Sequence, residues 1–278
     1  MTNSKVDEIP LNSSDPNSIL PIRMENWSFE IDGKPILKHV SFSIEEGHFV
    51  TIVGPNGAGK TTLLKCLMRI LIGGSGGIQI MGNPINSFSQ RDLAKNMSYV
   101  PQAIGRKLPY TAIEFVTMGR YPYFNAFSPI KREDHEAVAK ALEMVGMTDF
   151  EYRMMDTLSG GERQKIFIAA ALAQETKIML LDEPTAFLDP KHEDELHRLL
   201  AMVKKERGMT ILTVTHDINH AALMSDRVLA LKDGQCVFYG EPSQFMNDDL
   251  LYQLFGKRFL FVAHPTAGTP VVISDVWK

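Results

Sequence analysis

Apolar and polar side chains alternate in the N-terminal third of the chain, which is the pattern of β-strands. Val40, Phe42 and Ile44 fall on one face of an extended segment, residues 45–47 supply a turn, and residues 48–53 form an almost continuous apolar run. A half-buried strand alternates in this way, whereas a fully buried strand is apolar throughout. The pattern therefore predicts an antiparallel flap that leads into a buried central strand.

Helical spacing follows in two places. The glycine-rich segment that begins at residue 54 opens a predicted helix, which the glycines of residues 73–77 stop and whose apolar positions are Leu63, Leu64, Leu67 and Met68. From about residue 103 to residue 172 the spacing is again helical. Within that stretch, residues 133–145 carry one apolar face, made of Ala137, Val138, Ala141, Leu142 and Val145. We therefore predict an inserted helical subdomain over about residues 103–172.

Three short apolar runs, at residues 178–181, 210–214 and 228–231, alternate with helical segments in the last third of the chain. Strands separated by helices predict an α/β fold with a mostly parallel sheet that has helices on both faces. We expect a polar N-terminal extension at residues 1–20, one large domain at residues 21–265 and a C-terminal tail at residues 266–278. No apolar run approaches the roughly 20 residues that cross a bilayer, and no secretory signal is expected.

Composition and charge narrow the class of protein. The 278 residues are 44% hydrophobic, which is ordinary for a buried core, and the net charge is −4. This balance argues against a dedicated nucleic-acid binder, which neutralises phosphates with an excess of lysine and arginine. Cys66 and Cys236 are too few and too far apart for a metal knuckle or a disulfide framework, and we expect both to be inert.

The chain carries a phosphate-binding loop between the first buried strand and the helix that follows it. Residues 54–61 match the pattern G-x-x-x-x-G-K-[ST] in the strand-to-helix context that the pattern requires, and a second threonine follows. The loop thus consists of Gly54, Pro55, Asn56, Gly57, Ala58, Gly59, Lys60, Thr61 and Thr62. Backbone N–H groups and the helix N-terminus bind phosphate oxygens in such a loop. We expect Lys60 to reach the β- and γ-phosphates of ATP and the Thr61 hydroxyl to ligate Mg²⁺. A glycine-rich turn before an ordinary helix would explain neither the lysine nor the paired threonines.

Two acids end the apolar run at residues 178–181. Asp182 stands where a buried parallel strand delivers its side chain to the ligand edge of a sheet, and we expect it to hold Mg²⁺. Glu183 points elsewhere and can act as the general base that polarises the attacking water. The alternative is that the two acids simply mark the boundary between strand and loop.

A second anion-binding turn distinguishes this chain from most phosphate-loop proteins, such as kinases, GTPases and helicases. It consists of Leu158, Ser159, Gly160, Gly161, Glu162, Arg163 and Gln164. Ser159 can cap the following helix while the two glycines expose backbone N–H groups. Because the phosphate loop already cradles the triphosphate of its own chain, the second turn is expected to contact ATP held by another copy. A serine-capped helix without a ligand is the alternative interpretation.

With these motifs, residues 22–263 resemble the nucleotide-binding subunit of an ABC transporter, and residues 158–164 match the family signature without a mismatch. The resemblance implies a P-loop NTPase core with an N-terminal antiparallel β-subdomain and an inserted α-helical subdomain. It also implies that Gln102 links Mg²⁺ and the γ-phosphate to the helical subdomain. Leu188 and Asp189 correspond to the loop that crosses the dimer interface, and His216 to the switch histidine that steadies the attacking water.

The sequence departs from the family pattern at two positions. Ile31 stands about six residues before Leu37, where the family usually has an aromatic residue that stacks on adenine. Trp27 and Phe29 are near but would have to shift register to replace it. Ala170 occupies a position commonly filled by arginine, and we have no functional account of that change.

Two segments resemble those of ATPases that serve ferric-siderophore, haem and vitamin B12 importers. They are residues 119–122, Gly-Arg-Tyr-Pro, and residues 262–265, Val-Ala-His-Pro. Residues 108–111 and 118–127 are rich in aromatic residues and prolines, and they would form either a groove for a permease helix or the core of a small subdomain. The resemblance implies a homodimer on the cytoplasmic face of the bacterial plasma membrane, with two separate permease subunits and an external substrate-binding protein.

Other functions are less consistent with the sequence. A molybdate or zinc importer ATPase is the nearest alternative. A DNA-repair or chromosome-maintenance ATPase would need a long coiled coil between phosphate loop and signature, where this chain has only residues 62–158. A ribosome-acting relative would need two such cores in one chain, and a kinase has no use for the signature turn.

Overall fold

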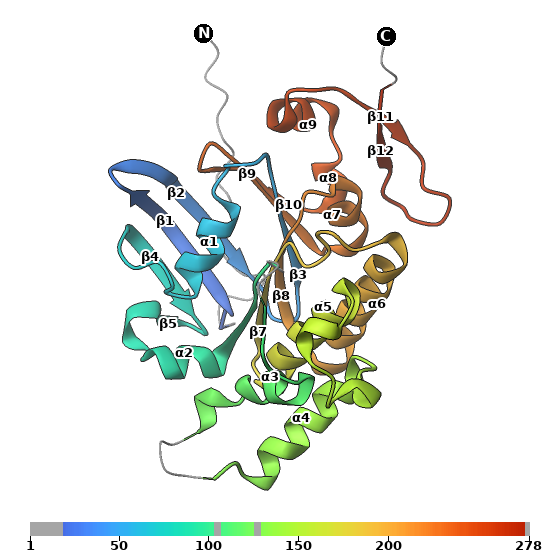
Figure 1. Ribbon diagram of the computed structural model, residues 1–278. Helices are drawn as coiled ribbons and strands as arrows, with labels where there is room; N and C mark the ends of the chain where they lie inside the picture. The colour runs from blue at the N-terminus through green and yellow to red at the C-terminus, as the bar shows by residue number, and fades with distance from the viewer. Residues whose placement is uncertain (1–18, 103–106, 125–128, 276–278) are drawn as a thin grey trace. The chain divides into compact units, whose positions relative to one another are not determined.

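The computed structural model describes residues 19–102, 107–124 and 129–275. The chain divides into two compact units, the first formed by Met1–Ser87 and Thr210–Lys278 and the second by Phe88–Met209. The predicted α/β class is confirmed, with mostly parallel strands, covering helices and an N-terminal antiparallel sheet (Figure 1). The domain boundaries given above remain predictions.

The antiparallel sheet of the first unit has the order β2-β1-β4-β5, with strands Lys34–Ile44, Ile22–Ile31, Ser75–Ile80 and Asn83–Pro84. A 3₁₀ turn, η1 (Ile85–Ser87), follows β5. Strand β1 pairs antiparallel with both β2 and β4. Val40, Phe42 and Ile44 are all buried, which confirms the predicted flap and its inward face.

A second set of strands in the first unit carries the buried centre. Strand β3 (Phe49–Val53) pairs in parallel with β8 (Thr210–Val214) and with β9 (Arg227–Lys232), and β10 (Gln235–Gly240) pairs antiparallel with β9. All five residues of β3 and of β8 are buried. The apolar runs in the sequence therefore mark strands that are covered on both faces.

Helix α1 (Lys60–Leu67) is shorter than the glycine pattern predicted, and Met68 caps it. The expectation that residues 73–77 stop this helix is wrong, because Arg69 already adopts a left-handed φ of 50° and β4 begins inside the glycine run. A left-handed residue cannot continue a right-handed helix. The glycines serve the strand instead: at Gly76 a Cβ atom would lie 2.4 Å from the carbonyl oxygen of Asn26 on β1.

The C-terminal part of the first unit packs in one apolar cluster with Val53 of β3 and with residues of β9. It contains helices α7 (Ile218–Met224), α8 (Pro242–Phe245) and α9 (Asp248–Phe255) and the antiparallel pair β11 (Phe259–Val262) and β12 (Val271–Ser274) (Figure 1). Asn219 on α7 fixes β12, since its amide nitrogen donates to the carbonyl of Val272 (3.0 Å) and its amide oxygen accepts from the N–H of the same residue (2.7 Å). Strand β12 lies within the segment predicted as a tail.

Among its described residues, the second unit has a parallel pair of strands and five α-helices besides the 3₁₀ turns. Strand β6 (Met97–Val100) follows α2 (Gln90–Asn96) and pairs in register with β7 (Ile178–Asp182), which precedes α6 (Pro190–Arg207). The helical part contains α3 (Ala112–Met118), α4 (Arg132–Met144) and α5 (Gly160–Ala173), with the 3₁₀ turns η2 (Tyr121–Tyr123), η3 (Thr148–Phe150) and η4 (Met155–Thr157). Helix α4 confirms the helix predicted at residues 133–145.

Buried Arg120 holds the helical part together. Its guanidinium donates to the carboxylate of Asp134 on α4 (2.9 Å), to the carbonyl of Ala173 at the end of α5 (2.7 Å) and to the carboxylate of Glu175 (2.7 Å). It also lies 4.1 Å from the ring centre of Tyr123. Burial opposes ionisation of Asp134, but the hydrogen bonds from Arg120 and from the Lys131 backbone outweigh it and lower the pKa of this carboxyl group.

Among the described residues, no helix combines the length and the apolar character that a membrane crossing requires. The segment expected to meet a permease is described only up to Phe124, because Asn125, Ala126 and Phe127 lie outside the described residues, as does the expected start of the helical subdomain at Ala103.

We predict that Arg120→Ala lowers the free energy of unfolding by about 3 kcal/mol, because it leaves the Asp134 carboxylate buried without its charged partner. Urea unfolding followed by circular dichroism measures this change. Arg132→Ala is the matched control, since Arg132 pairs with Glu136 in an exposed contact on the same helical part and should cost below about 0.5 kcal/mol. Equal losses in the two variants would contradict the assignment of Arg120.

Candidate functional site

The loop between β3 and α1 depends on glycines for its path. At Gly54 the backbone has a φ of 147°, and a Cβ atom would lie 2.1 Å from the carbonyl oxygen of Leu231 on β9. Gly57 and Gly59 follow with φ of 78° and 100°, which L side chains rarely adopt. The structure thus has the strand-loop-helix unit that the motif predicted, in which backbone N–H groups are offered to an anion.

Lys60, the first residue of α1, folds back over this loop. Its side chain is buried, and Nζ donates to the carbonyl oxygens of Gly54 (2.8 Å) and Pro55 (2.9 Å). The ammonium group is therefore held inside the curve of the loop by neutral acceptors. Phosphate oxygens are stronger acceptors for a charged donor, so an incoming triphosphate can displace these carbonyls.

His216 leaves the same edge of the first unit as the phosphate loop. Strand β8 runs parallel to β3 and in step with it to the ends of both strands. Thr215 then donates its backbone N–H to the carbonyl of Ile52 (3.2 Å), exposed His216 follows, and Asp217 caps α7. The sequence located His216 after a strand, and the structure adds that this strand is the neighbour of the one that carries the phosphate loop.

His216 also borders a cavity of about 340 Å³ in the first unit. Besides this histidine, the cavity is lined by residues of α7, the end of α9 and the C-terminal strand pair: Asp217, Ile218, Asn219, Phe255, Lys257, Phe259, Val272 and Ser274. One side of the imidazole therefore faces open space.

The aromatic residues near Ile31 do not reach its position. Phe29 is buried in the core, and Trp27 packs so closely on the backbone that a Cβ atom at Gly74 would lie 2.8 Å from its ring. Ile31 itself stands at the end of β1 and is 40% exposed. A base bound here would meet an aliphatic side chain.

In the second unit, parallel pairing of β6 and β7 brings two strand ends together. Gln102, just after β6, donates its amide Nε2 to the carboxylate Oε2 of Glu183, just after β7, at 3.0 Å. Tyr99 on β6 donates its hydroxyl to the carboxylate Oδ2 of buried Asp182 at 3.2 Å. Burial raises the pKa of Tyr99, and the neighbouring Asp182 carboxylate raises it further. Tyr99 was not predicted from the sequence, because nothing marks a tyrosine inside a buried strand as a partner of a later acid.

Glu183 turns away from Asp182 because its backbone is left-handed, with a φ of 50°. Such a conformation costs a residue other than glycine roughly 1–2 kcal/mol. It gives the two adjacent carboxylates different directions: Asp182 stays buried beside Tyr99, while half-buried Glu183 meets Gln102.

The signature turn is a complete helix N-cap. Ser159 accepts from the backbone N–H of Glu162 (3.3 Å), and the Glu162 carboxylate accepts from the backbone N–H of Ser159 (2.7 Å). These hydrogen bonds, led by the one from the Ser159 backbone, lower the pKa of Glu162. Ser159 and Gly160 are exposed, whereas Leu158, Gly161 and Gln164 are buried. Contact with a second molecule is thus open to Ser159 and Gly160 first.

The Leu188–Asp189 motif leads into helix α6. Asp189 caps this helix by accepting from the backbone N–H groups of Lys191 and His192, and half-buried Leu188 precedes it. Phe187 is 90% exposed and has a left-handed φ of 67°. This exposed aromatic residue beside an expected interface was not predicted from the sequence, because it stands between two other apolar residues, Ala186 and Leu188, and resembles an ordinary core position.

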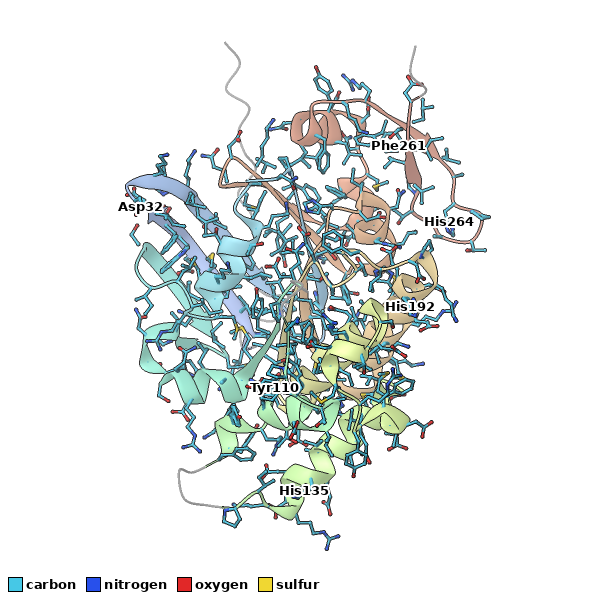
Figure 2. The ribbon with its side chains drawn as sticks, viewed as in Figure 1. Asp32, Tyr110, His135, His192, Phe261 and His264 are labelled. Carbon is cyan, nitrogen blue, oxygen red and sulfur yellow. The ribbon has the colours of Figure 1, made fainter. Side chains whose placement is uncertain are left out.

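The aromatic segment of the second unit is partly exposed. Tyr121 is 60% exposed and meets Phe124 edge to face, with ring centres 5.7 Å apart. Tyr110, which is labelled in Figure 2, is exposed as well. Arg91 on α2 holds the segment, because its guanidinium donates to the carbonyls of Pro122 (2.7 Å) and Phe124 (2.6 Å).

Residues 37–186 match the family model described as ABC transporter, which is more than half of the chain. The chain belongs to the ABC transporter family. It is 36% identical to the ferric enterobactin transport ATP-binding protein FepC of Escherichia coli K12 over 256 residues, which is 92% of this chain and 94% of that protein. It is 39% identical to the iron(3+)-hydroxamate import ATP-binding protein FhuC of Bacillus subtilis 168 over 239 residues, covering 86% of this chain and 89% of the relative.

Among solved structures of ABC proteins, the chain resembles an ATP-binding cassette determined as a dimer in a post-hydrolysis state with bound ADP and phosphate. The TM-score is 0.68 at 30% identity, over 80% of this chain and 98% of that one. The match covers most of the length of both chains and supports the fold.

Both cysteines of this ABC protein are free, in the first unit. Burial raises the pKa of the Cys66 thiol to about 11 and that of the Cys236 thiol to about 12. Both side chains therefore remain neutral thiols near pH 7, in keeping with the inert role that we expect.

We predict that Gly54→Ala lowers the free energy of unfolding by roughly 3 kcal/mol, because the new Cβ atom meets a main-chain carbonyl in addition to the strain of positive φ. Gly57→Ala is the matched control, since its Cβ atom would meet nothing within 4 Å and only the strain of about 1–2 kcal/mol remains. Urea unfolding of the two variants measures the difference. A Gly57 variant that loses as much as the Gly54 variant would contradict the clash.

Proposed function

We propose that this chain binds and hydrolyses ATP as the motor subunit of an importer for ferric siderophores. The observation that carries the proposal is the presence, in one chain, of a phosphate loop and a serine-capped signature turn. Both motifs lie in a chain that aligns with FepC over 92% of the residues of this chain, at 36% identity. Haem and corrinoids remain the alternative cargoes, followed by molybdate and zinc.

The first unit supplies the groups that hold the triphosphate. In the proposal, backbone N–H groups of residues 54–62 and the N-terminus of α1 bind the phosphate oxygens. Lys60 exchanges its carbonyl acceptors for the β- and γ-phosphates, and His216 contacts the γ-phosphate from the neighbouring strand end. The adenine then lies against Ile31, so its binding relies on aliphatic contact rather than on aromatic stacking.

Oxygen atoms suited to Mg²⁺ are present in both units: the hydroxyl of Thr61, the carboxylate of Asp182 and the amide oxygen of Gln102. Hard oxygen ligands are the ones that Mg²⁺ prefers, and Gln102 commits its nitrogen rather than its oxygen to Glu183. Bound Mg²⁺ would neutralise charge on the β- and γ-phosphates. Tyr99 restrains the Asp182 carboxylate by its hydrogen bond.

Glu183 is the proposed general base. Its left-handed backbone separates it from Asp182, and its hydrogen bond from Gln102 fixes the carboxylate. In this role it accepts a proton from the attacking water while His216 stabilises the γ-phosphate. Gln102 is proposed to report the occupancy of the site to the helical part, since it lies just after strand β6, at the point where the chain leaves the strand for that part.

Two copies of the chain are proposed to share ATP. Exposed Ser159 and Gly160 contact the nucleotide bound by the partner, supported by Leu158, Gly161, Glu162 and Gln164, and Leu188 and Asp189 line the dimer interface. The dimeric cassette with bound ADP and phosphate, which is 30% identical, supports this arrangement.

The exposed aromatic segment at Tyr121 and Phe124 is the proposed docking place of a permease helix. The proposed assembly comprises two ATPase subunits and two permease subunits at the cytoplasmic face of the plasma membrane, with an external substrate-binding protein. The relatives named for ferric enterobactin and ferric hydroxamate support iron chelates as the cargo.

We predict that Glu183→Gln retains ATP binding, accumulates as an ATP-bound dimer and loses at least about 10²-fold in steady-state hydrolysis, because the amide cannot accept the proton of the attacking water. Size-exclusion chromatography with Mg-ATP and a phosphate-release assay measure these effects. Asp194→Asn is a matched control, since Asp194 is an exposed carboxylate on α6 paired with Arg198, and it should hydrolyse ATP normally. Unimpaired turnover in Glu183→Gln would remove Glu183 as the base.

We predict that deletion of the gene abolishes uptake of radiolabelled iron from a defined ferric siderophore and leaves molybdate and zinc uptake unchanged. Complementation with the wild-type gene should restore uptake, whereas the Glu183→Gln gene should not. Uptake assays with ferric siderophores, haem, corrinoid, molybdate and zinc in parallel identify the cargo. Loss of molybdate or zinc uptake alone would replace the proposed cargo by the nearest alternative.

A further inference from the structure

Helices α5 and α6 each begin at a motif expected to face the partner subunit, and their first turns are packed together. The contact lies at buried Gly161, the second glycine of the signature turn. A Cβ atom at this position would lie 2.5 Å from Cδ2 and 2.6 Å from Cγ of the His192 ring. His192 is therefore seated against the backbone of the signature turn, in space that only glycine leaves.

The other side of the imidazole is bound to the motif that begins α6. The Nδ1–H group of His192 donates to the carboxylate Oδ2 of Asp189 at 2.6 Å. The Oδ1 atom of the same carboxylate accepts from the backbone N–H groups of Lys191 (3.0 Å) and His192 (3.1 Å). The hydrogen bond from the His192 side chain is the main cause of the lowered pKa of Asp189. Both oxygens of Asp189 are thus committed to the first turn of α6.

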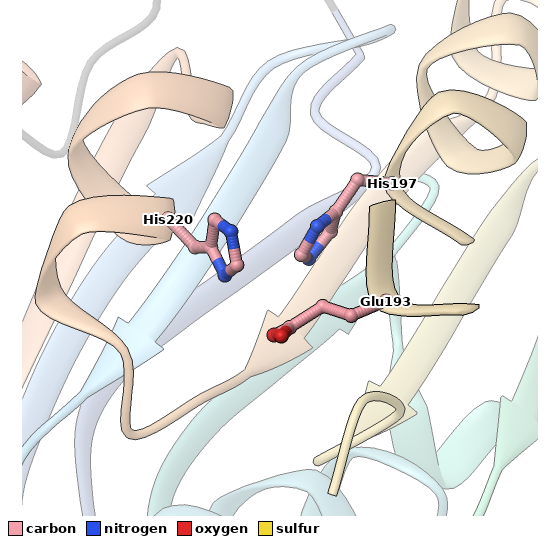
Figure 3. A group of neighbouring side chains, drawn as sticks. All are labelled: Glu193, His197 and His220. Atoms are coloured by element: carbon pink, nitrogen blue, oxygen red, sulfur yellow. The ribbon is translucent and has the colours of Figure 1, made fainter. Parts of the chain in front are cut away.

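A second link joins the two helices one turn further on. Lys165 on α5 donates to the carboxylate of Glu195 on α6 at 2.7 Å. Glu193 and His197 leave α6 on a different side from His192, because residues one and five positions later are rotated by about 100° and 140°. Figure 3 shows these two side chains projecting together from α6. The link to the signature turn therefore belongs to His192 and not to that neighbouring pair.

We propose that His192 is a positioning residue that joins the signature turn to the Leu188–Asp189 loop, so that the two motifs approach the partner's nucleotide as one surface. This inference rests on the proposed function, because it requires the signature turn to act on ATP of a second subunit. The ring sets the distance between Gly161 and Asp189. Loss of either contact leaves each motif intact but lets the two shift relative to one another.

The test uses the purified full chain and the variant His192→Phe, which keeps a planar ring against Gly161 and removes the hydrogen bond to Asp189. The expected result is a kcat for ATP hydrolysis lowered by about tenfold, since small misplacements of reacting groups are costly. Affinity of the dilute monomer for a fluorescent ATP analogue should change less than about twofold, because the phosphate loop is untouched. An unchanged kcat in His192→Phe would overturn the proposal.

Lys191→Ala is the matched control, because Lys191 is the neighbouring residue on the same turn and its side chain is 80% exposed. It should retain the wild-type kcat, and a loss equal to that of His192→Phe would also overturn the proposal. If wild-type protein hydrolyses ATP as fast at dilutions without dimers as at high concentration, the shared-site function fails. The dilution test uses only wild-type protein, so failure of the shared-site function can be told apart from failure of the role proposed for His192.

The packing contact is tested by a double-mutant cycle on thermal unfolding. Gly161→Ala should lower the Tm markedly in the presence of His192 and only slightly in the His192→Ala background, where the ring no longer occupies the space. Additive shifts would show that the ring does not rest on Gly161 and would contradict the proposal.

Discussion

Parallel pairing of short buried strands is the constraint on which the rest of this structure depends. Two parallel strands end at the same edge, so whatever follows them in sequence is brought close together whether or not it is near in the chain. In the first unit, β3 and β8 place the phosphate loop and His216 at one edge, although 154 or more residues separate them. In the second unit, β6 and β7 do the same for Gln102 and Glu183, at 3.0 Å.

Backbone conformation then decides which way the side chains at these edges point. Gly54 takes a φ of 147° beneath the carbonyl of Leu231, which only glycine permits, and Glu183 takes a left-handed φ at the cost of strain. The strain at Glu183 gives two adjacent acids different surroundings, one buried with Tyr99 and one held by Gln102. Two chemically alike carboxylates can therefore be given two different tasks.

Much of this arrangement could be predicted from sequence where the signal is local. Alternation at Val40, Phe42 and Ile44 predicted β2, and the apolar face of residues 133–145 predicted α4. The end of α1 could not be predicted from the glycines. The helix stops before them, at left-handed Arg69, and nothing in the sequence marks this arginine as a residue that adopts a positive φ. The roles of Tyr99 and His192 could not be predicted for another reason. Tyr99 contacts Asp182 and His192 contacts Gly161, and only the packed structure brings these residues together.

The second unit also connects the edge at Gln102 and Glu183 to the exposed aromatic segment, through strand β6 and a set of hydrogen bonds. Strand β6 ends next to Gln102, which binds Glu183, and it begins at Met97, whose carbonyl accepts from the amide of Gln174 (3.1 Å) at the end of the signature helix α5. The carbonyl of Gln174 in turn accepts from the hydroxyl of Tyr123 (3.0 Å).

Buried Arg120 binds the carbonyl of Ala173 beside Gln174, and Arg91 binds the carbonyls on either side of Tyr123. The signature helix is thus tied at its start to the loop at Asp189 and at its end to the segment that carries Tyr121. Because packed and hydrogen-bonded elements shift as bodies rather than deform, a displacement of the first turn of α5 would also move that segment. In the proposed function, this helix, fixed at both ends, is the element through which hydrolysis would be coupled to movement of the permease.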